Sequence, residues 1–256
     1  MPIILPRTPS FDLSGKRALV TGAGRGIGTG AAAALAQAGA EVTLAARSED
    51  EIMAVAQAIR SEGGHAATLT LDVTDLAATA AALEAQAPFD ILVNNAGTNR
   101  PAHFLDVTVE DFDHVSALNL RAAFFVAQAV ARKLAAADRP GSIIHMASQM
   151  GHVGGAQRSV YCATKHAIIG LTKAMAIDLG PKGIRVNAIC PTFIETPMTK
   201  PFFDDPKFAE SVFAKIKLGR VGRIEDIMGA VVYLASDASA LVTGGSLMID
   251  GGWTAE

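Results

Sequence analysis

Short apolar segments alternate with longer helix-forming segments along almost the whole chain, and this alternation restricts the fold more than any other feature. Several short segments are apolar throughout, as expected of strands that are buried on both faces of a sheet. The predicted strands are residues 17–21, 41–46, 66–71, 89–94, 142–147, 184–190 and 246–249. Strands that alternate with helices form right-handed βαβ units. We therefore expect an α/β fold with a seven-stranded parallel sheet and helices on both faces.

The chain is expected to form a single domain over residues 1–256. Its length would also allow two smaller domains, but no linker-like segment interrupts the alternation. Residues 1–12 precede the first predicted strand and are expected to form an N-terminal arm. Residues 196–222 contain three prolines and four phenylalanines and have no strand pattern. We expect this segment to fold over the site as a substrate lid.

Composition excludes several classes of protein. Hydrophobic residues make up 50% of the chain and charged residues 18%, which argues against intrinsic disorder. The formal net charge of −3 favours neither nucleic acid nor an anionic membrane as a partner. The apolar run at 227–235 is too short to cross a bilayer, and residues 1–9 do not resemble a signal peptide. The two cysteines form no disulfide framework, so we expect a cytoplasmic location.

A glycine-rich turn follows the first predicted strand. Its sequence, Thr21-Gly22-Ala23-Gly24-Arg25-Gly26-Ile27-Gly28, leads directly into an alanine-rich helix. Glycines allow backbone N–H groups to approach a pyrophosphate, and a helix N-terminus favours its negative charge. On the first βα turn of an alternating chain, this pattern favours a dinucleotide-binding Rossmann fold, with Gly22, Gly26, Ile27 and Gly28 among the cofactor-binding residues. The alternative is a strand–helix turn that binds no ligand.

The end of the second predicted strand bears on which dinucleotide is bound. NAD-binding chains use an acidic side chain there to accept hydrogen bonds from ribose hydroxyls. This chain has Ala45-Ala46-Arg47-Ser48 instead, and Arg47 is suited to pairing with a 2′-phosphate. Arg25 in the glycine turn would add a second positive charge. The pattern favours NADP over NAD, and the alternative for Arg47 is a solvated residue at a helix start.

Tyr161 and Lys165 are four residues apart, a spacing that places two side chains on one face of a helix. The pKa of a tyrosine is near 10, and a neighbouring cation lowers the pKa of an acid by about 1–3. We therefore expect Lys165 to make Tyr161 a usable general acid/base near neutral pH. Taken alone, such a pair is weak evidence of a site.

Other polar residues are expected at the same edge of the sheet, because ligands of open parallel sheets bind beyond the carboxyl ends of the strands. Ser148 follows the fifth predicted strand, where its hydroxyl would hydrogen-bond a developing oxyanion. The sequence Asn94-Asn95-Ala96-Gly97 follows the fourth strand, and Asn119 interrupts an apolar helical segment. A buried asparagine needs hydrogen-bond partners. The candidate catalytic residues are Asn119, Ser148, Tyr161 and Lys165.

Together these residues resemble the short-chain dehydrogenase/reductase family over about residues 13–253. The matching motifs are Thr21-Gly22-x-x-x-Gly26-Ile27-Gly28, Asp72, Asn94-Asn95-Ala96-Gly97, Asn119, Ser148, Tyr161-x-x-x-Lys165 and the segment from Pro191 to Thr196. The resemblance implies hydride transfer between NADP(H) and a secondary alcohol or ketone on a single-domain Rossmann fold.

The resemblance also implies the role of each catalytic residue. Tyr161 would exchange a proton with the substrate oxygen. Lys165 would lower the pKa of Tyr161 and hold the nicotinamide ribose. Ser148 would orient the carbonyl group, and Asn119 would help to hold a water for proton relay.

Further cofactor contacts follow from the same resemblance. Asp72 and Val73 would contact the adenine, and Asn95 the adenosine-side ribose region. Ile194 and Thr196 would contact the nicotinamide carboxamide. The family often has Pro-Gly after the sixth strand, whereas this chain has Pro191-Thr192. We therefore expect no glycine-only backbone angle at Thr192 and a locally different nicotinamide pocket.

Other chemistries are disfavoured by the sequence. No pair of the six histidines has the spacing of zinc ligands, so no metal site is expected, and His145 is expected to be packed within its strand. Cysteine catalysis by Cys162 lacks an evident histidine base. Ser148 does not lie in a Gly-x-Ser-x-Gly turn, which argues against a serine hydrolase.

The substrate pocket is expected to involve residues 98–104 and 149–158 together with the lid. The phenylalanines of the lid favour an apolar wall, whereas a sugar acid or polyol would use polar groups near the mouth, namely Arg100, His103, His152, Gln157, Arg158 and Lys200. The segment Asn99-Arg100 resembles the gluconate-dehydrogenase branch of the family. A 3-oxoacyl thioester, a cyclic ketone and a steroid-like alcohol remain alternative substrates. The alternative for each of these polar residues is a solvated position at the rim that binds no substrate.

Two other functions and the assembly state remain open. One function is a catalytically silent dinucleotide-binding sensor, and the other is a methyl-donor-binding Rossmann domain, which the Tyr161/Lys165 pair disfavours. The helical segments 108–137 and 159–179 carry apolar residues on more than one face. Such helices pair across subunits in the family, so the resemblance implies a homotetramer.

Overall fold

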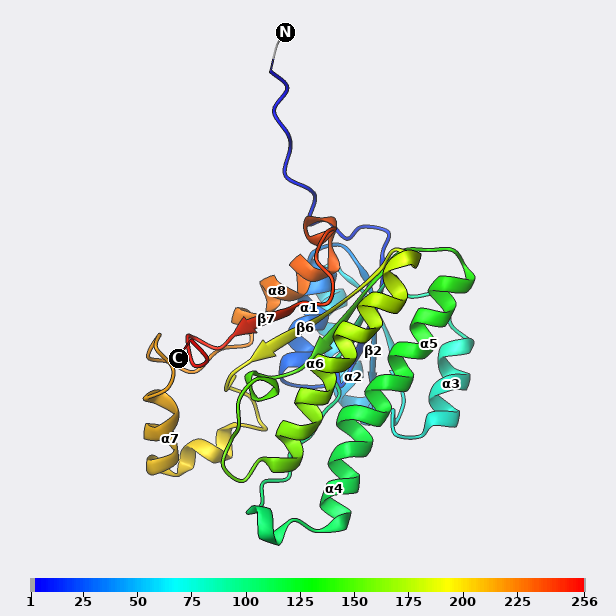
Figure 1. The fold of residues 1–256 in the computed structure, drawn as a ribbon. Coiled ribbons are helices and arrows are strands. Elements are labelled where there is room, and N and C mark those ends of the chain that lie inside the picture. Colours follow the sequence, from blue (N-terminus) through cyan, green and yellow to red (C-terminus); the bar gives the residue numbers. More distant parts are fainter. Residues whose placement is uncertain (1–2, 256) are drawn as a thin grey trace.

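Seven parallel strands form one sheet in the order β3-β2-β1-β4-β5-β6-β7 (Figure 1). The computed structural model describes residues 3–255, so the first two residues of the expected N-terminal arm and residue 256 lie outside the described part of the chain. The strands are β1 (Arg17–Thr21), β2 (Glu41–Ala46), β3 (His65–Thr70), β4 (Ile91–Asn94), β5 (Gly141–Met146), β6 (Ile184–Pro191) and β7 (Ser246–Ile249). The predicted α/β fold with a seven-stranded parallel sheet is confirmed.

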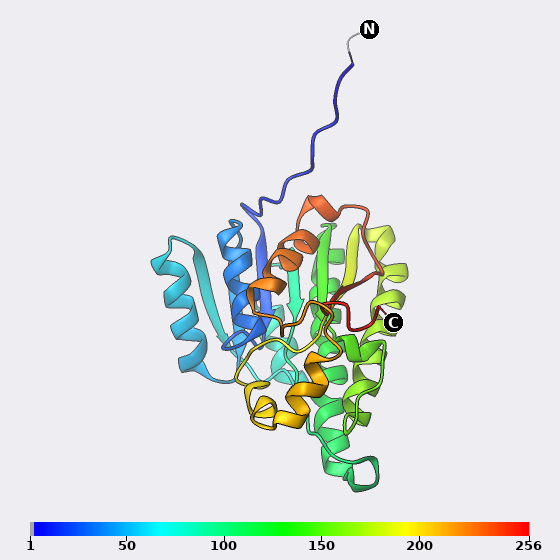
Figure 2. The same cartoon turned by 90° about the vertical axis from the view of Figure 1, so that its left-hand side faces the viewer.

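Helices cover both faces of this sheet (Figure 2). They are α1 (Ile27–Gln37), α2 (Glu49–Ser61), α3 (Leu76–Glu84), α4 (Val109–Ser116), α5 (Ala123–Ala136), α6 (Ser159–Leu179), α7 (Pro206–Phe213) and α8 (Glu225–Ala235). Buried apolar residues of α1, α2 and α8 pack on one face, and those of α3, α5 and α6 pack on the other. Small residues allow close approach on the first face. A Cβ atom at Gly30 of α1 would lie 2.1 Å from the Ile224 side chain.

The ends of some elements differ from the prediction. β3 begins one residue earlier than expected, and β4 begins two residues later. Ser48 is the N-cap residue of α2, but its side chain makes no capping hydrogen bond. Thr108 does cap α4, because its hydroxyl accepts a 3.1 Å hydrogen bond from the backbone N–H of Asp111.

The topology places one open crevice at the carboxyl edge of the sheet. β1 lies between β2 and β4, so the chain runs outward to β3 on one side and then crosses to β4 on the other. In open α/β sheets, ligands bind at this switch point, beyond the carboxyl ends of the strands. The glycine turn after β1 and the asparagines after β4 therefore meet at the same crevice.

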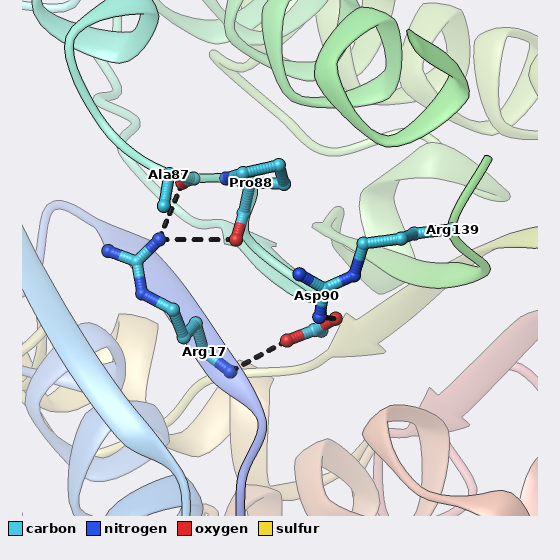
Figure 3. A network of polar contacts seen from close by, with 5 residues as sticks. All are labelled: Arg17, Ala87, Pro88, Asp90 and Arg139. Atoms are coloured by element: carbon cyan, nitrogen blue, oxygen red, sulfur yellow. Dashed lines mark hydrogen bonds and ion pairs between the residues drawn. The ribbon is translucent and has the colours of Figure 1, made fainter. Parts of the chain in front are cut away.

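A polar network fastens the opposite edge of the sheet (Figure 3). The backbone N–H of Arg17 donates a 2.9 Å hydrogen bond to the Asp90 carboxylate, which also pairs with the Arg139 guanidinium. The Arg17 guanidinium donates to the carbonyl oxygens of Ala87, at 2.6 Å, and Pro88, at 3.2 Å. These bonds join the start of β1 to the segment that leads into β4 and to the chain after α5.

Two segments extend from this framework. The described N-terminal residues run away from the body as an extended chain (Figure 1). Residues 196–222 form a 3₁₀ turn (Lys200–Asp204), helix α7 and connecting loops, and a backbone bridge joins Ile194 to Gly222. Phe203 and Phe208 of this segment pack against Phe193, which also contacts Trp253. No helix within residues 3–255 has the length and apolar character needed to span a membrane.

Candidate active site

A cavity of about 510 Å³ lies at the carboxyl edge of the sheet and has a volume typical of small-molecule sites. Most of the predicted site residues line it: Gly22, Arg25, Gly26, Ile27, Arg47, Asp72, Val73, Asn95, Ser148, Tyr161, Lys165, Ile194 and Thr196. Gly28 and Asn119 do not line the cavity. They support residues that do, as the geometry around each of them shows.

The glycine turn brings the chain backbone close to the cavity. Gly22 and Gly26 have φ angles of +64° and +60°, in the left-handed region that glycine adopts readily. A Cβ atom at Gly28 would lie 2.1 Å from the carbonyl oxygen of Gly22, so a larger residue would push α1 away from β1. The N-terminus of α1 therefore opens directly onto the cavity, as pyrophosphate binding requires.

Two arginines stand at the other end of the cavity, after β2 and in the glycine turn. The Nη1 atom of Arg47 lies 4.0 Å from the Asp72 carboxylate, and the Nη1 atom of Arg25 lies 3.5 Å from that of Glu51. Both arginine side chains are 70% exposed. Exposed ion pairs contribute little to stability, so both guanidinium groups are free to engage a phosphate. Glu51, which was not among the predicted site residues, turns to Arg25 instead of capping α2.

Asn95 joins the glycine turn to the end of β4. Its Nδ2 atom donates hydrogen bonds to the carbonyl oxygens of Thr21, at 3.0 Å, and Gly22, at 3.2 Å. The neighbouring Asn94 is buried and donates a 2.6 Å hydrogen bond to the carbonyl oxygen of Ala123 in α5. Asn95 thus shapes the rim of the cavity in addition to lining it.

Asn119 lies in a π-helical segment, Ala117–Ala122, between α4 and α5. Its side chain pairs with the backbone of Thr98: Oδ1 accepts a 2.8 Å hydrogen bond from the N–H, and Nδ2 donates a 2.9 Å hydrogen bond to the carbonyl oxygen. Nδ2 also donates to the Thr164 hydroxyl of α6 at 3.3 Å. Short π segments occur frequently at functional sites. Here the segment places an amide between the rim of the cavity and the helix that carries Tyr161.

Tyr161 and Lys165 share a face of α6, as predicted. The Lys165 Nζ lies 5.5 Å from the centre of the Tyr161 ring and donates a 2.7 Å hydrogen bond to the carbonyl oxygen of Met146. Ser148 follows β5, and its hydroxyl accepts a 3.1 Å hydrogen bond from the backbone N–H of Met150. Three polar side chains from two elements therefore converge on one part of the cavity.

Burial dominates the ionisation of this group. It raises the pKa of Tyr161 above its ordinary value of 10, whereas a hydrogen bond with Ser148 and the charge of Arg158 act in the opposite direction. Burial also lowers the pKa of Lys165 to about 8. The lowering of the Tyr161 pKa that was expected from Lys165 is not found, because the loss of solvation is the larger effect. The sequence pattern alone does not report how deeply the phenol is buried.

The loop after β6 closes the far end of the cavity. Thr199 fixes its shape, since its hydroxyl accepts a 3.0 Å hydrogen bond from the N–H of Thr196 and donates a 2.5 Å hydrogen bond to the carbonyl oxygen of Ile194. Among the non-glycine residues of the described chain, only Asp138 and Gln157 have positive φ angles. Thr192 therefore has no glycine-only backbone angle, as predicted.

The architecture and the site agree with what is found in known proteins. The profile of the family described as enoyl-(acyl carrier protein) reductase matches residues 22–254, from the glycine turn to the C-terminal segment. The chain belongs to the short-chain dehydrogenase/reductase family. The match spans the motifs on which the resemblance rests, and the relatives described below are named as reductases and dehydrogenases.

Curated relatives of this short-chain dehydrogenase/reductase share about two fifths of its residues. L-xylulose reductase of Bos taurus is 42% identical over 95% of this chain and 98% of the relative. Gluconate 5-dehydrogenase of Gluconobacter oxydans is 41% identical over 95% of this chain and 96% of the relative. Both alignments span nearly the whole length of each protein.

Solved structures have the same fold. A short-chain type dehydrogenase/reductase from Mycobacterium marinum is 42% identical, has a TM-score of 0.92 and covers 96% of this chain and 98% of its own. A gluconate 5-dehydrogenase from Burkholderia cenocepacia, solved with NADP and tartrate, is 37% identical, has a TM-score of 0.92 and covers 96% of this chain and 98% of its own.

The polar residues expected near the mouth of this dehydrogenase/reductase have different environments. Arg100 is paired with Asp111 at 2.8 Å, and the His152 Nε2 lies 3.7 Å from the Cys190 Sγ. Arg158 is buried. Within residues 3–255, no group of three or more histidine, cysteine or acidic residues is arranged to hold a metal ion. The sequence did not predict the part of the rim formed by His114, Ala117 and Leu118, which only the folded arrangement brings to the cavity.

Proposed function

We propose that the protein is an NADP(H)-dependent oxidoreductase that interconverts a secondary alcohol and a ketone. The observation that carries this proposal is the convergence of Ser148, Tyr161 and Lys165 on the cavity that also contains the glycine turn. When bound there, the cofactor supplies or accepts a hydride. The chain supplies the proton chemistry and the positioning of the substrate.

Tyr161 is the proton-exchanging group. In the reductive direction its phenol donates a proton to the substrate oxygen, and in the oxidative direction the phenolate removes one. Ser148 donates a hydrogen bond to the same oxygen and so stabilises the negative charge that develops on it. The hydrogen bond between Ser148 and Tyr161 also favours the phenolate. These two hydroxyls therefore act on one oxygen atom from two directions.

Lys165 and Asn119 support this pair. Lys165 is buried beside Tyr161, where its ammonium group would hold a ribose hydroxyl of the nicotinamide half. Asn119 holds the Thr98 segment and α6 in register, and the polar groups around it are suited to a water that returns protons from solvent to the site. Ile194 and Thr196 line the cavity from the loop after β6, where they would contact the nicotinamide carboxamide.

The residues expected around the adenosine half of the cofactor determine the preference for NADP over NAD. Arg47 and Arg25 flank the cavity with two exposed guanidinium groups, which suit the doubly charged 2′-phosphate. Asp72 and Val73 lie where the adenine would rest, and Asn95 lies near its ribose. The Burkholderia relative solved with NADP supports the same assignment.

A sugar acid or polyol is the proposed class of substrate, because the relatives include L-xylulose reductase and gluconate 5-dehydrogenase. Residues 196–222 serve as the lid that closes over it, within a single domain preceded by an N-terminal arm at residues 1–12. A 3-oxoacyl or cyclic-ketone substrate is the second candidate, favoured by the aromatic cluster under the lid.

We further propose a cytoplasmic homotetramer with no nucleic-acid or membrane partner. Apolar side chains remain exposed on the helices expected to pair, with Phe112 51%, Phe124 39% and Phe125 40% exposed. Pairing of these helices across subunits would cover the three rings. Light scattering tests this part of the proposal, since a monomeric mass contradicts it.

Tyr161→Phe separates the enzyme from a catalytically silent dinucleotide-binding sensor. Loss of the phenol should lower kcat by about 10³-fold or more for a panel of sugar acids and polyols, with NADP⁺ affinity unchanged in a fluorescence titration. Turnover that survives the substitution contradicts the proposed mechanism. A parent protein that binds NADP⁺ but turns over none of the panel is the result expected of a sensor.

A further inference from the structure

A buried arginine lies next to the catalytic tyrosine. Arg158 is the N-cap residue of α6, three positions before Tyr161, and only 6% of its surface is exposed. Residues three apart on a helix are neighbours, and Lys165 continues the same face one turn further on. Arg158 therefore begins the row of side chains that carries the proposed chemistry. The positive charge of Arg158 also favours the phenolate form of Tyr161 and so acts to lower its pKa.

No acidic group among residues 3–255 pairs with this arginine. Within residues 3–255, Arg158 forms no ion pair, and the first turn of α6 contains no Asp or Glu. Its guanidinium donates one 3.3 Å hydrogen bond, to the carbonyl oxygen of the adjacent Gln157, and lies 4.9 Å from the centre of the Phe202 ring. A guanidinium group has five N–H donors. Most of its hydrogen-bonding capacity is therefore not used by the described protein.

The surroundings of Arg158 hold it in this place. Gln157 has a φ angle of +57°, which is uncommon for a residue other than glycine, and its carbonyl oxygen also accepts a 3.2 Å hydrogen bond from the N–H of Ala102. Phe202 belongs to the proposed lid, so the guanidinium links α6 to that segment. By contrast, Arg100 at the same mouth is paired with Asp111 and is more exposed. Arg158 is thus fixed, buried and without a counter-charge, whereas Arg100 is already neutralised.

We propose that Arg158 binds the carboxylate of the substrate, so that this oxidoreductase acts on a hydroxy acid or its oxo acid in preference to a neutral polyol or ketose. This inference rests on the proposed function, since it names the substrate class of the same site. A buried cation is costly unless it is paired, and an arginine binds a carboxylate through two parallel hydrogen bonds. The substrate carboxylate supplies the missing charge, while the reacting carbon, further along the molecule, lies at Tyr161 and Ser148.

This assignment also explains selectivity. A neutral polyol of the same length would leave the guanidinium buried and unpaired, which penalises its binding. A sugar acid of that length accepts hydrogen bonds from the guanidinium through its carboxylate and also neutralises its positive charge. The Phe202 ring packs against the guanidinium, with its centre 4.9 Å from the Arg158 Cζ atom. Charge at this position, and not pocket shape alone, then separates the two kinds of substrate.

The first experiment compares acids with matched neutral alditols. kcat/KM is measured with NADP⁺ for D-gluconate against D-glucitol and for L-threonate against L-threitol. The parent protein should prefer at least one acid over its alditol by tenfold or more. In Arg158→Met this preference should fall by about 10- to 100-fold, mainly through a higher KM for the acid. Arg158→Lys keeps the positive charge but lacks the two parallel N–H donors of the guanidinium. Its preference for the acid over the alditol should therefore lie between those of the parent and Arg158→Met.

Two controls separate recognition from folding. Lys173→Met removes an exposed positive charge from the same helix, away from the cavity, so the acid-to-alditol ratio should change by less than about threefold. A merely structural role for Arg158 would lower turnover of the acid and the alditol alike and would weaken NADP⁺ binding. Equal loss for both substrates, or a parent protein that prefers the alditols, overturns the proposal.

A binding measurement keeps this test independent of turnover. In the Tyr161→Phe background with NADP⁺ present, calorimetry should detect D-gluconate or L-threonate, and the double variant Tyr161→Phe/Arg158→Met should bind it at least tenfold more weakly. Acid that binds no better than its alditol overturns the role of Arg158. An enzyme that oxidises only the alditols leaves the proposed oxidoreductase function intact, whereas absence of NADP⁺-dependent turnover with any alcohol, together with tight NADP⁺ binding, contradicts that function instead.

Discussion

The Lys165 ammonium donates a 2.7 Å hydrogen bond to the carbonyl oxygen of Met146, the last residue of β5. This bond joins the helix that carries Tyr161 to the strand that leads to Ser148. It also provides the buried cation with a partner, although burial still lowers the pKa of Lys165 from 10.5 to about 8. Lys165 is thus held in place at a cost in stability.

Lys165→Met should therefore make the protein more stable and inactive. The change in pKa from 10.5 to about 8 corresponds to about 3 kcal/mol of unfavourable burial at pH 7, offset by about 1 kcal/mol for the hydrogen bond to Met146. The free energy of unfolding at pH 7 should rise by about 1–2 kcal/mol. Because native Lys165 loses its proton above pH 8 while the unfolded chain keeps it to 10.5, the gain should shrink between these values. Urea denaturation at pH 7 and pH 10 measures this, with the exposed Lys173→Met as control.

Ser148→Ala should shift the pH dependence of alcohol oxidation. Oxidation requires the Tyr161 phenolate, so kcat/KM should increase with pH into the alkaline range. Ser148 lowers the pKa of Tyr161, and its removal should move this increase to higher pH. The loss of one oxyanion donor should also lower kcat by about 10²–10³-fold. Initial rates between pH 6 and 10.5 provide the profile, and an unshifted profile argues against the assigned role. The exposed Ser61→Ala should match the parent.

Arg47→Ala should change the preference between cofactors. Loss of a charge-assisted contact with the 2′-phosphate should raise KM for NADP⁺ by about 10- to 100-fold, while KM for NAD⁺ stays within about threefold. Arg25→Ala should have the same direction of effect. Steady-state kinetics with both cofactors measures the shift. Equal changes for NAD⁺ and NADP⁺ would place Arg47 away from the phosphate.

His145→Gln should reduce the sensitivity of the protein to acid. Burial, with a contribution from the charge of Lys165, lowers the pKa of His145 to about 4. In the unfolded chain the pKa of this histidine is 6.5, so below that pH protonation favours the unfolded state. The contribution of neutral His145 to the free energy of unfolding is therefore fully present above pH 6.5 and is lost as the pH falls through 4. The loss attributable to this residue is about 3 kcal/mol. Free energies of unfolding at pH 7, 5.5 and 4.5 should decline less steeply in His145→Gln, whereas the exposed His65→Gln should follow the parent.

The sequence was sufficient to predict the sheet, the glycine turn and the pairing of Tyr161 with Lys165, because each depends on local spacing. It was not sufficient for the π-helical segment at Asn119, since one extra residue in a turn is stabilised by contacts with Thr98 and Thr164, which are distant in sequence. The pairing of Glu51 with Arg25 was not predicted, because it depends on how α2 docks. The pKa of Tyr161 was misjudged for a related reason: burial is a property of the assembled fold.

The network of Arg17, Asp90 and Arg139 lies at the amino edge of the sheet, opposite the edge that carries the cavity (Figure 3). Because β1, β4 and the chain before β5 are fastened there, the loops at the other edge contribute less to holding the strands together. Substitutions at Arg158, Thr192 or in the lid are therefore able to alter what the enzyme accepts without dismantling its core. This separation gives evolution, or an enzyme engineer, freedom to rebuild specificity on an unchanged scaffold.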